Sequence, residues 1–307
     1  MKTMMRKSSE DRGFTMVEIM VATLIAAVVL SAVAITYTGS VRGYTRNREM
    51  AQTQMRARVS LEFVAQELRN VGYLVNWDPA PSVPPLLLNP AALAAMMDPG
   101  TDAVTVSAAV GPFSGTGTRI ATLNAPPVVG ATDTTLNLSA NNLPVPISAG
   151  TPLLVFTPPT TANVRNAANA ISGSDTSIVL ATTSITSGFG NGTPVLLVQQ
   201  TSFWIQGGNL MMSIGTPGAT PQQLAANVED LQIVLLDNNG AVLAAPNGSE
   251  RALRLSVTAR STRPVQDKTA QVPPSLEDHD RSGQPADQFL RQIDQTTVYL
   301  RNYGTLG

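Results

Sequence analysis

Glu18 is the side chain in this sequence whose position most clearly calls for chemistry, because it stands at the edge of a long apolar segment. From Ile19 to Val41 the chain carries no charged residue, which is 23 consecutive positions. A helix rises about 1.5 Å per residue, so a segment of this length spans the roughly 30 Å hydrocarbon core of a bilayer. A carboxylate beside such a segment is costly unless it is paired. Glu18 is therefore a functional candidate that requires a partner.

The residues around Glu18 resemble the leader of type IV pilins and type II secretion pseudopilins. The family motif is Gly, then Phe or Met, then Thr-Leu-Val-Glu and apolar residues, and residues 13–18 read Gly-Phe-Thr-Met-Val-Glu, with Met in place of Leu. The resemblance implies that a prepilin peptidase cleaves after Gly13 and methylates the new amino group of Phe14. It also implies a role for Glu18 in filament assembly, within a mature chain of residues 14–307.

The role that the resemblance implies for Glu18 has a physical basis. In an apolar filament core, the terminal amine of one subunit and the Glu18 carboxylate of its neighbour are each costly alone and tolerable together. The alternative is a signal anchor whose glutamate lies near the lipid headgroups. An ordinary secretory signal has a shorter apolar core and a small-residue cleavage site after it, which this segment lacks. Basic residues flank the segment on both sides, so only the resemblance places its N-terminus in the cytoplasm.

The rest of the chain offers little catalytic chemistry. The single histidine, His279, lies in the charged run 277–280, where a solvated loop is a simpler interpretation than a metal site, although the acidic cluster can bind Ca²⁺ weakly. The run 237–240, Asp-Asn-Asn-Gly, lacks the later Glu of a calcium loop and is explained by a hairpin turn. The motifs of serine hydrolases, zinc proteases and phosphate-binding loops are absent. We predict no enzymatic activity, no catalytic residue, no cofactor and no metal site.

Composition limits the remaining function classes. The 307 residues are 43% hydrophobic and 13% charged with a net charge of −1, which allows one or two ordinary cores and gives no overall attraction for nucleic acid. Residues 101–200 contain only Arg119 and Arg165 as basic side chains, which argues further against DNA capture. The chain has no cysteine. Its fold must therefore stand without disulfides, even though the resemblance implies the periplasm or the cell exterior.

A regular apolar pattern after the charge-free segment predicts that the helix continues. Five apolar residues recur at spacings of 4, 3, 4 and 3 and so share one helix face, namely Ala57, Leu61, Val64, Leu68 and Val71. We expect one helix from Phe14 to about Val71, apolar all round in its first half and amphipathic in its second, ended by Gly72. Gly39 and Gly43 are the expected points of bending or local melting, since each costs about 1 kcal/mol against Ala.

Beyond the helix, short apolar runs separated by Gly, Pro, Asn, Ser and Thr predict β structure, including a hairpin over residues 203–214 with its turn at 207–209. The predicted fold class is α+β, with the long N-terminal helix packed on an antiparallel β-sheet head that carries a β-rich inserted subdomain. The predicted organisation is a leader 1–13, a helix 14–75 with its transmembrane or filament-core part at 14–41, an irregular connection 76–100, an inserted β subdomain 101–200, and a C-terminal β-sheet 201–307.

The middle of the chain repeats itself at an offset of 42 residues. Residues 133–138 align with 175–180, and 150–156 align with 192–198, with no gap between the two blocks and seven identities in 24 positions. Residues 150–152 and 192–194 both read Gly-Thr-Pro, and each precedes an apolar strand. We interpret this as two β units that pair with each other into a small barrel or sandwich, and the alternative is coincidence among strands rich in Thr and Ser.

The C-terminal third resembles the PilW family of minor pilins. The resemblance rests on a Leu-Gln strand and turn at 228–240, an Arg-Leu-x-Val strand at 253–260 and a final strand at 294–302. It implies a minor pilin that acts in pilus initiation or in the tip complex, with other minor pilins, the major pilin, a PilY-type tip adhesin and the prepilin peptidase as partners. The protein would lie in the inner membrane before assembly and in the pilus, at its tip, afterwards. The alternatives are a J-like pseudopilin of type II secretion and a surface-binding module anchored by a pilin helix.

Overall fold

A computed structural model describes the chain in several stretches. The described residues are 14–109, 119–141, 147–157, 161–172, 175–182, 185, 188–245, 249–265 and 269–301. They form two units that divide after Glu49, and each is described by itself below. The predicted leader, residues 1–13, lies outside the described residues.

The first unit consists of the N-terminal part of helix α1 (Met16–Leu68). Its side chains are exposed almost throughout, and by length and composition the helix can cross a membrane. Five Ser and Thr hydroxyls along it donate to backbone carbonyls of the preceding turn, for example Ser31 Oγ to the Ala27 oxygen at 2.8 Å. These hydroxyls are thereby satisfied within the helix, which keeps this part of its surface compatible with lipid or with other apolar helices. The local melting expected at Gly39 or Gly43 is not observed, because the α-helix is unbroken through both positions.

The second half of α1 buries the face that the sequence pattern predicts. Ala57, Leu61, Val64 and Leu68, together with Val71 just after the helix, are all 5% exposed or less. Turn residues 69–74 connect the helix to a short 3-10 helix, η1 (Val75–Trp77). The predicted amphipathic stripe is therefore confirmed.

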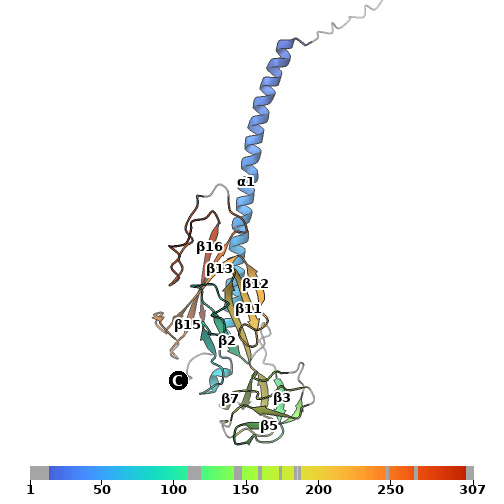
Figure 1. The fold of residues 1–307 in the computed structure, drawn as a ribbon, viewed down its shortest axis with the longest axis vertical. Helices are drawn as coiled ribbons and strands as arrows, with labels where there is room; N and C mark the ends of the chain where they lie inside the picture. Colours follow the sequence, from blue (N-terminus) through green and yellow to red (C-terminus); the bar gives the residue numbers. More distant parts are fainter. Residues whose placement is uncertain are drawn as a thin grey trace, which may run out of the picture. The chain divides into compact units, whose positions relative to one another are not determined.

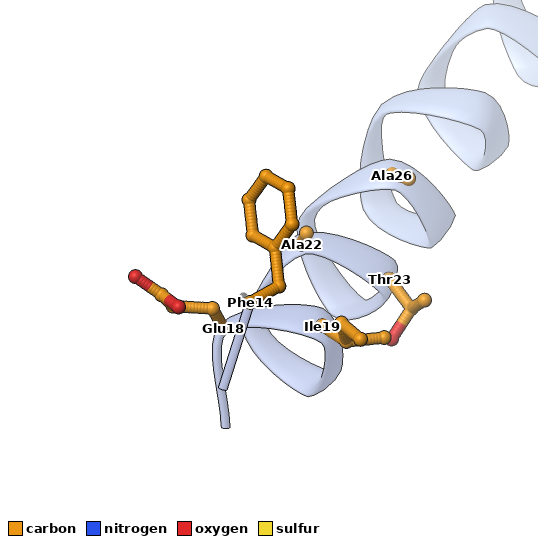
Figure 2. Close-up of a pocket in the computed structure, with 6 residues that line it drawn as sticks. All are labelled: Phe14, Glu18, Ile19, Ala22, Thr23 and Ala26. Atoms are coloured by element: carbon orange, nitrogen blue, oxygen red, sulfur yellow. The ribbon is translucent and has the colours of Figure 1, made fainter. Parts of the chain in front are cut away.

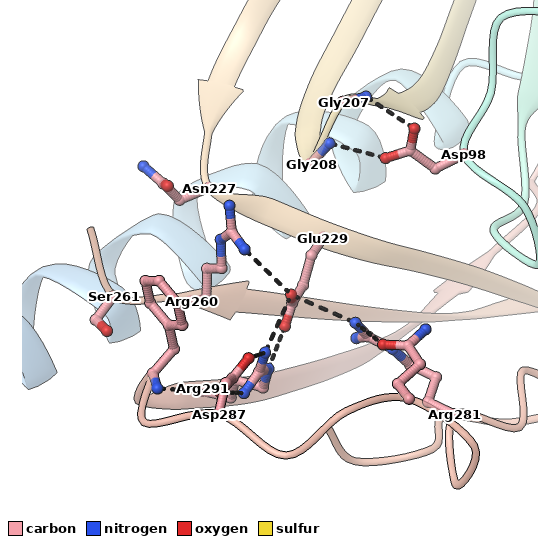
Figure 3. Close-up of polar contacts among 12 residues, drawn as sticks. Asp98, Gly207, Gly208, Asn227, Glu229, Arg260, Ser261, Arg281, Asp287 and Arg291 are labelled. Atoms are coloured by element: carbon pink, nitrogen blue, oxygen red, sulfur yellow. Dashed lines mark hydrogen bonds and ion pairs between the residues drawn. The ribbon is translucent and has the colours of Figure 1, made fainter. Parts of the chain in front are cut away.

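A five-stranded antiparallel sheet packs on this stripe. Its order is β1 (Leu86–Leu88), β2 (Val104–Ala108), β10 (Gln199–Gln206), β11 (Asn209–Ile214) and β12 (Gln222–Ala226). The predicted hairpin is β10–β11, and its turn residues Gly207 and Gly208 have φ of 59° and 69°, as a two-residue I′-type turn requires. The Asp98 carboxylate accepts both of their N–H groups at 2.8 Å (Figure 3).

Two of the predicted segment boundaries are wrong, because strands of this sheet lie inside segments that were expected to lie outside the head. Strand β1 lies inside the connection 76–100 that we expected to be irregular, and β2 lies inside the range 101–200 expected to form the insert. Both belong to the head because β2 pairs with β10, whose nearest residue is about ninety positions later in the chain. Pairing over such a distance leaves no local sequence signal.

A four-stranded antiparallel sheet completes the head. Its order is β14 (Val242–Leu243), β13 (Val228–Leu236), β15 (Ala252–Arg260) and β16 (Arg291–Tyr299) (Figure 1). The α1 stripe and both sheets share one core. Its largest contributors include Leu68, Phe203, Ile205, Leu231, Leu253 and Leu255. The predicted α+β class, a long helix packed on antiparallel sheets, is confirmed.

The middle of the chain forms a separate ring of strands (Figure 1). It contains β3 (Arg119–Leu123), β5 (Thr134–Asn141), β6 (Pro152–Thr157), β7 (Thr161–Asn166), β8 (Ser177–Leu180) and β9 (Pro194–Leu197), with the short β4 (Val128–Val129) beside β5. Pairing runs β8-β5-β3-β9-β6-β7. A bridge between Ala167 and Leu180 joins the end of β7 to β8 and closes the ring. We call this unit, residues 119–197, the barrel.

The barrel has an internal two-fold pattern that follows the 42-residue repeat. Leu136 faces its repeat equivalent Ile178 in the β5–β8 pair, and Leu154 faces its equivalent Leu196 in the β6–β9 pair. In antiparallel strands a residue can face its own copy only on a two-fold axis, so both pairs mark one pseudo-axis. The two Gly-Thr-Pro turns are held in a similar way, since the Gly150 and Gly192 N–H groups each donate at 2.8 Å to a carbonyl, although the acceptors, Ala167 and Leu123, are not repeat equivalents.

The barrel is joined to the head by an apolar contact and a buried ion pair. Val75, Val83 and Val198 share a core with the outward-facing Leu154 and Leu196. Nearby, Arg165 of β7 pairs with Asp78, whose side chain is 1% exposed. The barrel therefore packs on the head through a specific interface.

Candidate functional site

The N-terminus of α1 is closed by a reciprocal cap between Thr15 and Glu18. The Thr15 hydroxyl accepts the Glu18 N–H at 3.2 Å, while Glu18 Oε2 accepts the Thr15 N–H at 2.9 Å and its hydroxyl at 3.0 Å. This is a capping box, in which two backbone donors at a helix start are satisfied by side chains. Thr15 was not singled out from the sequence, although the Thr-x-x-Glu pattern that identifies it is present there. The cap fixes the Glu18 side chain at the first turn.

The Glu18 carboxylate projects from the helix near Phe14 (Figure 2). Phe14 is 84% exposed, and Glu18 is exposed as well. The cap engages only Oε2 of Glu18, which leaves Oε1 without a hydrogen bond within the described residues. Of the predicted processing residues, Phe14 is described and Gly13 lies outside the described residues.

A shallow groove lies beside these two side chains. It has a volume of about 480 Å³ and is lined by Phe14, Glu18, Ile19, Ala22, Thr23 and Ala26 (Figure 2). Small side chains form its floor, and Phe14 stands at its end. Small residues on an apolar helix allow a second helix to approach closely, so the groove can accept an apolar helix while the free carboxylate oxygen accepts a cation.

Comparison with known families assigns this segment. Residues 9–34 match the prokaryotic N-terminal methylation motif. The chain is type IV pilin-like. Its motif implies processing by a prepilin peptidase, and its apolar N-terminal helix suggests a location in the membrane and then in a pilus. The pilin-like class is non-enzymatic, as the absence of catalytic motifs from the sequence predicted.

Two further comparisons concern the whole chain. A type IV-like pilin from Thermus thermophilus is similar in structure, with a TM-score of 0.38 and 14% sequence identity over 82% of this chain and 97% of that one. Comparison with characterised proteins by sequence gives no match. The membership in the PilW family that the C-terminal strands suggested therefore stays a prediction for this pilin-like chain.

The head of this pilin-like chain contains a second polar cluster, centred on Glu229 of β13 (Figure 3). Its carboxylate forms an ion pair with Arg291 of β16. Its Oε2 also lies 3.4 Å from Nη2 of Arg281 and 4.0 Å from Nη1 of Arg260 on β15. Burial lowers the pKa of Arg291, but its hydrogen bonds to Asp287 and Glu229 outweigh burial and raise it above its ordinary value. The cluster ties residues 269–290, which we call the strap, to the four-stranded sheet. Its role is structural.

The strap also contains His279, whose surroundings differ from the solvated loop that the sequence predicted. Its side chain is 11% exposed and its Nδ1 lies 2.8 Å from Asp230 Oδ2, which is fully buried. Burial raises the pKa of Asp230, although hydrogen bonds from Gln232 and His279 act against the rise. His279 is buried because the strap folds back over Asp230 of β13, a contact that local sequence cannot indicate. Within the described residues, no group of three or more His, Cys, Asp or Glu side chains is placed to hold a metal ion.

The Asp237 run forms the turn between β13 and β14. Asp237 Oδ1 accepts the N–H groups of Asn239 at 2.8 Å and Ala241 at 2.7 Å. The carboxylate is used by the turn itself, as the hairpin interpretation requires.

Proposed function

We propose that this chain is a minor pilin that enters a type IV pilus through the N-terminal part of α1 and acts in pilus initiation or in the tip complex. The observation that carries the proposal is the first unit of the chain, an apolar helix whose side chains are exposed and which begins with a capped carboxylate. Leaving an apolar surface of this length exposed to water is energetically costly. It calls for lipid before assembly and for other helices afterwards.

Glu18 gives this helix its register in a filament. Its Oε1 is available, and the groove beside it fits an apolar neighbour. The methylated amine of Phe14 in an adjoining subunit is a cation on an apolar residue, so it matches both features. A charge pair formed away from water fixes one axial position, since any shifted position leaves two costly charges unpaired.

The second unit supports a role other than that of a bulk filament subunit. The barrel adds about eighty residues at the end of the strands β2 and β10, and its own core is separate from that of the head. Initiation and tip complexes tolerate such bulk because few copies are present. By family resemblance the partners are other minor pilins, the major pilin and a PilY-type tip adhesin.

The test replaces Glu18 with Ala in the chromosomal gene. The variant is expected to remain in the inner membrane, since losing a charge favours insertion, but to be depleted from sheared pili and to reduce piliation. Glu49→Ala, on the same helix and outside the motif, is the matched control and should leave both readouts unchanged. Normal piliation with normal recovery of Glu18→Ala in sheared pili would refute the proposal. Loss of protein secretion with intact pili would identify the pseudopilin alternative instead.

A further inference from the structure

A cavity on the head carries a second inference, independent of the filament role. It lies where the end of β1, the β13–β14 hairpin and the strap meet, and it has a volume of about 430 Å³. That size falls in the range of pockets that hold small ligands or single side chains. No function described above uses it.

One side of the cavity is aliphatic. Leu88, Ile233, Leu243 and Val242 line it, and Val242 is 62% exposed. Val242 and Leu243 make up β14, which lies at the edge of the four-stranded sheet and pairs only with β13 among the described strands. An apolar strand at the edge of a sheet is a site where a further strand can add.

The other side of the cavity is acidic. Asp102 accepts hydrogen bonds from the Asn89 amide at 2.8 Å and the Ile233 N–H at 2.9 Å, both neutral donors. Asp278 also lines the cavity. Burial raises the pKa of Asp102, and the charge of Asp278 adds to the rise. Neither carboxylate has an ion pair within the described residues, whereas the adjacent Glu277 is paired with Arg254 at 2.8 Å. Arg254 and Glu277 also line the cavity and neutralise each other, so the lining keeps an excess of two carboxylates, Asp102 and Asp278.

We propose that this cavity binds a lysine or arginine side chain presented by an extended, apolar segment of a partner protein. The cation would lie between Asp102 and Asp278, its methylene stem would pack on Leu88 and Leu243, and its backbone would align with β14. Long basic side chains combine an apolar stem with a charged end, which matches the two sides of the cavity. An anionic or fully apolar segment would leave both carboxylates uncompensated.

The test uses the full chain in nanodiscs with labelled Ile, Leu and Val methyl groups, titrated with acetyl-Val-Arg-Val-amide. Saturable shifts at Leu88, Val242 and Leu243 are expected, and acetyl-Val-Gln-Val-amide should give none at the same concentrations. Asp278→Asn should weaken binding about tenfold, because a charge-assisted contact becomes a neutral one. Asp278 is exposed, so this variant is expected to fold.

Asp294→Asn, an acidic residue on β16 outside the cavity, is the matched control and should bind like the parent. Three results would overturn the proposal. They are the absence of saturable shifts up to about 10 mM peptide, equal binding of the Gln peptide, or unchanged affinity in Asp278→Asn. A parallel titration with Ca²⁺ tests the other occupant, and saturable shifts of the Leu88, Ile233 and Leu243 methyl groups with Ca²⁺ but not with the Arg peptide would reassign the site to a metal ion.

Discussion

The ion pair between Arg165 and Asp78 makes a sharp test of the interface between barrel and head. Asp78 is 1% exposed on its side chain, and within the described stretches its carboxylate accepts, besides Arg165, only the N–H groups of Val164 at 2.7 Å and Ala80 at 3.0 Å. Arg165→Met removes the cation and leaves a buried carboxylate with neutral donors alone. Breaking a buried pair in this way costs about 3–5 kcal/mol.

The reverse change should cost less. In Asp78→Asn the guanidinium keeps two carbonyl acceptors, Ala80 at 3.1 Å and Val164 at 2.8 Å, and it is the more exposed partner at 11%. The double variant is expected to be more stable than Arg165→Met alone, because it contains no unpaired charge.

The assay is urea unfolding of a soluble fragment that begins at Asn47, with all four proteins of the double-mutant cycle. Arg69→Met, whose ion pair with Glu62 is exposed, is the control and should change the free energy of unfolding by less than about 1 kcal/mol. Additive effects in the cycle, or a cost below about 1 kcal/mol for Arg165→Met, would refute the assignment of this pair to the interface.

Three further outcomes are expected. In a host with prepilin peptidase, terminal mass spectrometry should find a mature chain that starts at N-methylated Phe14, and an intact Met1 would contradict the processing prediction. Thr15→Ala should remove the cap and cost about 1 kcal/mol of helix stability, seen as faster amide exchange in the first turn, with Thr15→Ser as the control that retains it. Hydrogen bonds from Arg254 lower the pKa of Glu277, so the contribution of this carboxylate to folding stability is present above its unfolded pKa of about 4.3 and is lost as pH falls through the lower folded value. In the parent, strap amides should lose protection from hydrogen exchange over that pH range. In Glu277→Gln this pH-dependent step should be absent.

Local pattern was sufficient to predict the elements whose cause is local. The helix follows from a charge-free segment and a 4, 3, 4, 3 stripe, and β15 follows from strict alternation between Leu253 and Arg260. The β10–β11 hairpin follows from Gly207 and Gly208, which two-residue turns need. For the site, the motif identifies Phe14 and Glu18. The Thr15 cap could also have been predicted, because Thr-x-x-Glu at a helix start is the pattern of a capping box.

The elements that the sequence did not predict depend on distant partners. Strand β1 exists because Leu86–Leu88 pairs with β2, and β2 joins the head because it pairs with β10. The environment of His279 depends on Asp230, which is 49 residues away. In each case the residue types are compatible with a loop, and only the tertiary partner decides otherwise.

The place of the insertion has a physical explanation in the pairing of β2 with β10. Ala108 at the end of β2 faces Gln199 at the start of β10, so the barrel leaves and re-enters the head at adjacent points, as an elaborated hairpin turn does. Among the residues between 110 and 197 that the structure describes, none belongs to the core around α1. We expect that replacing 110–197 with Asn-Gly in the fragment from Asn47 preserves one cooperative thermal transition, because Ala109 and Val198 then continue the same register into a two-residue turn. The midpoint should fall, since Val75 and Val83 lose their cover. Loss of all cooperative structure would show that the head depends on the barrel and that the insertion is not a hairpin elaboration.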